Sequence, residues 1–99
     1  MNKSDLVRKL ANEHGLPVVL VRKVINDLFD AIMEDVLAGN TTTISGFGKF
    51  FQKYAKKKRR FDPNTGKVIT LSARMYPAFD PSLGFKKAVR SVSIKKETR

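Results

Sequence analysis

The amino-acid sequence predicts an α+β fold, in a chain of 99 residues whose length is typical of one small domain. Three observations lead to this prediction. Apolar residues recur at helical spacing through the first 37 residues, β-branched and alternating residues follow between residues 41 and 76, and a short helical pattern comes after residue 80. We therefore expect a helical hairpin, then antiparallel strands, then a short C-terminal helix.

The N-terminal helical hairpin has recognisable start and stop signals. Asn2 is a suitable N-cap, and Gly15 is suited to the position that follows the last helical residue. Pro17 fits the first turn of a second helix, whose wide apolar stripe extends over residues 18–37. The short link between the two patterns predicts two antiparallel helices.

The middle of the chain has the residue pattern of strands. Residues 41–44 are mostly β-branched, and residues 68–76 alternate between apolar and polar side chains, as half-buried strands do. We expect a turn at residues 45–48 and a break in the last strand at residues 77–79, where a proline occurs.

The last predicted element is a short helix. Asp80 is placed as its N-cap and Pro81 as its first helical residue, because both residue types favour these positions. The apolar pattern ends near Val89, so residues 91–99 are expected to form a basic C-terminal tail.

The most informative feature is a cluster of positive charge on one limb of a predicted β-hairpin. Six of the eight residues from Lys53 to Arg60 are basic, and the turn-forming residues 62–67 follow at once. A hairpin with this much charge cannot bury both faces. We therefore expect an arm, about residues 52–76, that projects from the domain towards an anionic partner.

The overall charge of +11 is unevenly placed. Residues 1–35 contain five basic and six acidic residues, whereas the remainder contains 15 basic and three acidic residues. No acidic residue occurs between Val36 and Phe61, so this part of the chain attracts polyanions, with nucleic acid as the first candidate. A membrane surface is a weaker candidate, because the basic segment lacks the spacing of an amphipathic helix.

The sequence offers no recognisable catalytic or metal-binding pattern. It contains no cysteine and one histidine, His14, and its acidic residues form no pair typical of acid–base catalysis. We expect no enzymatic activity, no metal and no cofactor. No secretory signal is visible, and no apolar run approaches the ~20 residues that span a bilayer, so we expect a soluble intracellular protein.

Several separated motifs resemble those of the bacterial histone-like DNA-bending proteins, HU and integration host factor. The motifs are Met1-Asn2-Lys3-Ser4, Gly46-Phe47-Gly48-Lys49-Phe50, Pro63-Asn64-Thr65-Gly66-Lys67 and Pro77-Ala78-Phe79, and the likeness covers residues 1–90. The resemblance implies a single domain with a three-stranded antiparallel sheet and a long protruding β-ribbon arm. It also implies an intertwined dimer that wraps double-stranded DNA through the minor groove.

The resemblance and the charge pattern together give the candidate site residues. Pro63 matches the family's arm-tip proline, which acts as a wedge between base pairs. The candidate DNA-binding residues are Lys3, Lys53, Lys56, Lys57, Lys58, Arg59, Arg60, Pro63, Asn64, Thr65, Lys67, Arg74 and Lys86. The candidate dimer-core residues are Leu28, Phe29, Phe47, Phe50 and Phe79.

The chain departs from the family pattern in two places. Arg60-Phe61-Asp62 stands where family arms commonly have Gly-Arg-Asn, so an aromatic and a negative charge lie beside the tip proline. Asp62 is expected to cap the turn through its side chain. In the last helix, Pro81-Ser82-Leu83 replaces the usual Gly and Lys, which weakens the expectation of DNA contacts there.

The predicted function is to bind double-stranded DNA largely without sequence specificity, and to bend and compact it. We expect a homodimer in the cytoplasm, associated with the nucleoid or packaged with a viral genome. The sequence leaves open a site-selective DNA-bending factor like integration host factor, a heterodimer with a paralogue, and RNA as the ligand. An alternative of another class is a basic module that binds an acidic protein.

Overall fold

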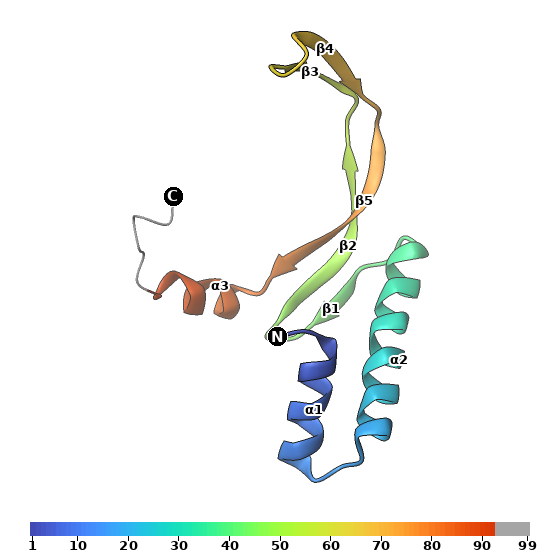
Figure 1. Cartoon of the computed structure of the whole chain (residues 1–99), viewed down its shortest axis with the longest axis vertical. Coiled ribbons are helices and arrows are strands. Elements are labelled where there is room, and N and C mark those ends of the chain that lie inside the picture. Colours follow the sequence, from blue (N-terminus) through green and yellow to red (C-terminus); the bar gives the residue numbers. More distant parts are fainter. Residues whose placement is uncertain (93–99) are drawn as a thin grey trace. The chain divides into compact units, whose positions relative to one another are not determined.

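The computed structural model describes residues 1–92, and Figure 1 shows the order of its elements. The described residues form two compact units, one of Met1–Asp35 and the other beginning at Val36. The elements are α1 (Lys3–His14), α2 (Val18–Leu37), β1 (Thr42–Ile44), β2 (Gly48–Ala55), β3 (Lys58–Asp62), β4 (Lys67–Leu71), β5 (Arg74–Pro81) and α3 (Leu83–Arg90). This order confirms the predicted α+β fold.

The caps of α1 are those that the sequence predicts. The side chain of Asn2 accepts a hydrogen bond of 2.9 Å from the backbone N–H of Asp5, and the Asp5 carboxylate accepts one of 3.0 Å from the Asn2 N–H. This reciprocal pair satisfies two backbone donors that a helix start otherwise leaves free. Gly15 ends the helix in the left-handed region at φ 62°, where a residue with a Cβ is strained.

The helical hairpin contains a small core. Val7, Ala11 and Val21 are buried, with Leu10 and Ile25 packed against them. The rest of the apolar stripe of α2 is largely open, and Leu28 and Phe29 remain 50% and 42% exposed. One chain therefore leaves much of its apolar surface uncovered.

The second unit contains the predicted three-stranded antiparallel sheet. Its strand order is β1-β2-β5, so β2 is central and β5 is an edge strand. β1 pairs with the start of β2, from Ile44 opposite Gly48 to Thr42 opposite Phe50. Beyond Phe50, β2 and β5 continue as a two-stranded ribbon that leads away from β1 and α3 (Figure 1).

The ribbon ends in a second sheet, formed by β3 and β4 alone. Between the last β2–β5 pair, Ala55 with Arg74, and the first β3–β4 pair, Lys58 with Leu71, two residues of each limb are unpaired. Because both limbs skip the same number of residues, the register continues unchanged through the interruption. The arm is therefore one ribbon with a local loss of pairing.

The expected break at residues 77–79 is wrong. β5 runs without interruption from Arg74 to Pro81, and Pro77 pairs with Gln52 in the β2–β5 ladder. An edge strand tolerates proline, because the missing N–H can lie on the side that has no neighbouring strand. The strand therefore continues through Pro77 because β5 lies at the sheet edge, and the local sequence pattern does not reveal that position.

The predicted start of the last helix is also wrong. Asp80 and Pro81 belong to β5, and Ser82 is the N-cap, with its hydroxyl accepting a 3.2 Å hydrogen bond from the Phe85 N–H. Asp80 pairs with Lys49 in the sheet ladder, which fixes its backbone in the extended conformation. Ser91 and Val92 follow the helix, and the rest of the predicted tail, residues 93–99, lies outside the described residues.

Candidate nucleic-acid interface

The arm exposes its basic side chains to solvent. The exposed cations are Lys53, Lys56, Lys57, Lys58, Arg59, Arg60, Lys67 and Arg74. Within residues 1–92, the ion pairs join Arg8 to Asp5, Lys9 to Glu13, and Asp80 to both Lys49 and Lys86. No arm cation in this list has an acidic partner in the described part of the chain. Their charge is free to act on an anionic ligand.

The strand register places these cations on both faces of the distal ribbon. Side chains alternate along a strand, and directly paired residues share a face. Arg59 therefore lies on the same face as its partner Thr70, whereas Lys58 and Arg60 lie on the other face. A polyanion that contacts either face meets positive charge.

A network of hydrogen bonds centred on Asp62 orders the tip of the arm. The Asp62 carboxylate accepts bonds from the Asn64 N–H at 3.0 Å and from the Thr65 hydroxyl at 3.2 Å. The Asp62 carbonyl accepts a further bond of 2.8 Å from the N–H of Gly66, whose φ of 70° is strained for other residues. Pro63 is exposed within this turn. The predicted capping role of Asp62 is confirmed.

Two predicted DNA-binding lysines lie outside the arm and have partners of their own. The ammonium group of Lys3, in the helical unit, donates a 2.8 Å hydrogen bond to the side-chain oxygen of Asn26. The ammonium group of Lys86, on α3, lies 3.4 Å from a carboxylate oxygen of Asp80. Both contacts are exposed, so solvent screens them and a phosphate can compete for either lysine.

Three of the predicted dimer-core residues gather at the base of the ribbon. The ring centroids of Phe50 and Phe79 are 4.8 Å apart, and those of Phe47 and Phe79 are 5.2 Å apart. Phe85 of α3 joins them, 5.7 Å from Phe47. Leu28 and Phe29 lie in the other unit, on α2. Sequence reasoning missed Phe85, although its place in the apolar pattern of the last helix was visible.

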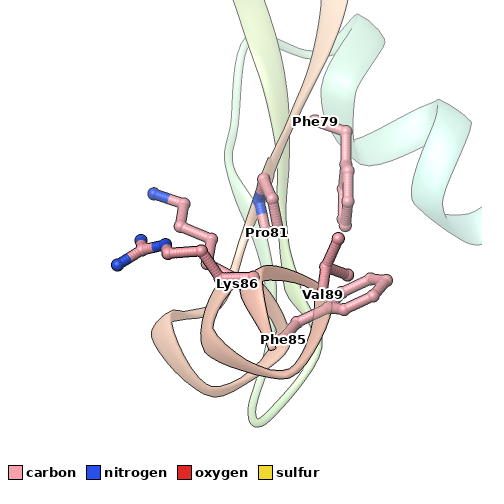
Figure 2. A pocket seen from close by; sticks show the side chains of 6 residues that line it. Phe79, Pro81, Phe85, Lys86 and Val89 are labelled. Atoms are coloured by element: carbon pink, nitrogen blue, oxygen red, sulfur yellow. The ribbon is translucent and has the colours of Figure 1, made fainter. Parts of the chain in front are cut away.

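An open hollow lies between the end of β5 and α3, and Figure 2 shows its lining. Phe79, Phe85 and Val89 form its apolar side, while Lys86 points away from them. Phe79 and Phe85 are 39% and 38% exposed, and Val89 is 59% exposed. This surface is apolar and uncovered in the single chain.

Two further kinds of feature are absent from the described residues. No group of three or more His, Asp or Glu side chains in residues 1–92 is arranged to hold a metal ion. No helix within that range is long and apolar enough to cross a membrane.

The family model for bacterial DNA-binding proteins matches residues 1–90. The chain belongs to this family. The match agrees with the geometry, because the residues it covers include the helical hairpin, the whole ribbon and α3.

Individual members of the bacterial DNA-binding protein family are similar over nearly their full length. The SPbeta prophage-derived DNA-binding protein HU 2 of Bacillus subtilis is 32% identical over 91 residues, which cover 92% of this chain and 99% of that protein. DNA-binding protein HU of Geobacillus stearothermophilus is 31% identical over 90 residues, covering 91% and 100%. These names are those of DNA-binding proteins and not of enzymes.

Solved structures of the family share the fold. A cocrystal structure of Anabaena HU with DNA has a TM-score of 0.82 and 27% identity, covering 93% of this chain and 100% of that one. The solution structure of a mutant of transcription factor 1 has a TM-score of 0.58 and 25% identity, covering 93% of each chain. The likeness therefore includes the arm as well as the helices.

Proposed function

We propose that this protein is a histone-like architectural protein that binds double-stranded DNA largely without sequence specificity and bends and compacts it. One observation carries the proposal. A two-stranded ribbon projects from the sheet with eight exposed cations and no acidic partner among the described residues. The likeness to HU proteins, one of them in a cocrystal with DNA, supports the same conclusion.

The physical state of the free arm fits this role. An isolated two-stranded ribbon is only marginally stable in water, and repulsion among neighbouring cations weakens it further. Phosphates remove that repulsion, and each neutralised phosphate releases condensed counterions from the DNA. Binding therefore stabilises the arm in its paired form, and the free energy comes mainly from electrostatics.

Pro63 is the proposed wedge. It is exposed at the tip, and proline is rigid, apolar and without an N–H that needs a partner. Proteins that insert an apolar wedge between base pairs spend a few kcal/mol on unstacking and gain contact area from the bent duplex. Asn64, Thr65 and Lys67 flank the wedge and contact the backbone on either side of it.

The functional unit is a dimer, and the low burial of the single chain supports this part of the proposal. Within residues 1–92 only Val7, Ala11 and Val21 are buried apolar residues, while the predicted dimer-core residues are mostly exposed. A second copy can cover such surfaces in a symmetric dimer. Light scattering is expected to give twice the chain mass of 11.2 kDa. A monomer mass at micromolar concentration would contradict the dimer.

The proposed location is the cytoplasm, on the nucleoid or on a packaged viral genome. The family relationship supports a DNA-associated location, because members of this family are bacterial DNA-binding proteins.

A salt series tests the DNA-binding proposal. Fluorescence anisotropy with a short labelled duplex should show log affinity falling linearly with log salt, with a slope of about 0.9 per neutralised phosphate. The matched variant lacks the distal arm: residues 56–73 are replaced by Asn-Gly, which closes the Ala55–Arg74 pair with a two-residue turn. Loss of binding in this variant supports the proposal. Unchanged binding would refute it.

Selectivity is tested by competition. A general binder is displaced equally by random duplex and by sequences enriched through repeated selection. A strong preference for the enriched sequences would instead identify a site-selective bender, which reads the deformability of DNA at positions it does not contact.

A further inference from the structure

Phe61 is the most exposed aromatic side chain of the described residues, at 64%. It lies on β3, two residues before Pro63. The ring contacts within residues 1–92 join Phe47, Phe50, Phe79 and Phe85, and none of them reaches Phe61. A large apolar ring is therefore held in water at the end of the arm.

The ribbon shields Phe61 poorly. Its directly paired residue is Val68, which is itself 55% exposed. On the opposite face, Ile69 is paired with Arg60, whose long aliphatic stem can cover it, and Ile69 is only 43% exposed. Phe61 and Val68 thus form an uncovered apolar pair on the face that also carries Arg59.

A partner subunit does not account for this exposure. The aromatic cluster that a second copy would cover includes Phe50, which is eleven residues before Phe61 in the same limb of the ribbon. At about 3.3 Å per residue, the two rings are roughly 35 Å apart along the ribbon. A surface that covers the base of the ribbon can leave the tip free.

We propose that Phe61 is a second DNA-contacting group of the arm, whose ring stacks on the face of a base at the bent step. This inference rests on the proposed function. Every base has a flat π-face, and aromatic side chains use it for contacts that tolerate any sequence. Bending by a wedge uncovers such a face. Arg59, on the same face as Phe61, and Lys67, paired with the next residue along β3, bring the duplex within reach of the ring.

The stacking is tested by fluorescence, because the chain contains no tryptophan. Phe61→Trp creates a single reporter at the site, and Ile69→Trp is the matched control on the opposite face of the same hairpin. Saturating duplex should quench the emission of Phe61→Trp and protect it from acrylamide, and should leave the emission of Ile69→Trp unquenched, because the face of Ile69 and Arg60 is proposed to contact phosphates and not bases. A blue shift of the Phe61→Trp emission without quenching would indicate contact with sugars and would overturn the stacking. The same response in both variants, or no response in either, would overturn it as well.

A binding series separates stacking from simple support of the ribbon. Phe61→Ala should weaken duplex binding at least about fivefold at every salt concentration, with the salt slope unchanged because the phosphate contacts remain. Val68→Ala, which removes the intramolecular partner, should bind nearly as tightly as the parent protein. If Val68→Ala weakens binding as much as Phe61→Ala does, the ring only braces the ribbon.

The same series distinguishes the two levels of the proposal. If the parent protein fails to bind duplex with a salt-dependent affinity, the proposed function is wrong. A different outcome is that the parent protein binds and bends DNA while Phe61→Ala binds as tightly as Val68→Ala and Phe61→Trp fluoresces as Ile69→Trp does. In that case only the proposed role of Phe61 is wrong.

Discussion

Asp62 accepts a hydrogen bond from the hydroxyl of Thr65 across the tip of the arm, at 3.2 Å. The Thr65 oxygen in turn accepts a weaker bond of 3.4 Å from the Lys67 N–H. The residue before Pro63 is thereby connected to the first residue of β4. This arrangement holds Pro63 in a defined turn, although an isolated two-stranded ribbon such as the one below it is only marginally stable.

Asp62→Ala should loosen the tip and weaken both binding and bending, because the turn loses acceptors for two hydrogen bonds, worth about 1 kcal/mol each before solvent screening. Asp62→Asn is the matched control. It keeps an acceptor oxygen of similar geometry and removes the negative charge, so it should bind duplex more tightly at low salt and lose this advantage at high salt. Anisotropy titrations at two salt concentrations measure both effects, and weaker binding by Asp62→Asn at low salt would contradict this account.

Pro63→Ala should reduce DNA bending more than affinity. In the proposed mechanism Pro63 acts on the deformation of the duplex, whereas the arm cations supply most of the attraction. Ring closure of short DNA fragments measures bending, and anisotropy on the same fragments measures affinity. Lys67→Ala is a useful comparison, since it should weaken affinity and lower the salt slope by about one phosphate. Equal ring closure by Pro63→Ala and the parent protein would remove Pro63 from the mechanism.

Gly48→Ala should destabilise the protein. A Cβ at this buried position would lie 2.6 Å from the Asp80 carbonyl oxygen and 2.6 Å from the Phe79 ring, and φ is 158°. Forcing in an extra methyl group typically costs about 1–3 kcal/mol in unfolding free energy. Urea denaturation measures the loss. Gly84→Ala is the control, because nothing lies within 4 Å of its Cβ and alanine favours a helix by about 0.5–1 kcal/mol.

Gln52→Leu should destabilise the second unit, in which Gln52 contacts Val36. The side-chain amide of Gln52 donates a 2.7 Å hydrogen bond to the carbonyl oxygen of Val36 in the last turn of α2. Leucine removes one of the two hydrogen bonds to that half-buried carbonyl, which keeps the 3.0 Å bond from the Gly39 N–H, so the expected cost is about 1 kcal/mol. Gln52→Glu should cost more, because a carboxylate would then face a carbonyl oxygen. Thermal unfolding ranks the variants, and equal stability of all three proteins would show that the bond is dispensable.

The features that the sequence predicted correctly depend on local chemistry. The bounds of α1 and α2 follow from Asn2, Gly15 and the spacing of apolar residues, all of which act within one or two turns. The tip was predictable for the same reason, because the side chain of Asp62 bonds to residues two and three positions ahead. The charge of the arm is a property of composition alone.

The features that could not be predicted from the sequence depend on contacts between residues far apart in the chain. Both Asp80 and Ser82 can cap a helix, and the choice is made by the pairing of Asp80 with Lys49, which keeps Asp80 in the sheet. Pro77 was expected to end a strand, yet it is tolerated because β5 has a free edge. The grouping of Phe85 with Phe47 likewise requires α3 to fold back on the sheet.

The matched interruption of the arm, where Lys56 and Lys57 lie across from Ser72 and Ala73, restricts how this arm can change length in evolution or design. Adding one residue to a single limb would move each later side chain of that limb to the other face of the ribbon. Phe61 and Val68 would then lie on opposite faces. Equal insertions or deletions in both limbs would preserve both the alternation and the pairing of residues across the ribbon. Relatives with longer or shorter arms should therefore differ by even numbers of residues.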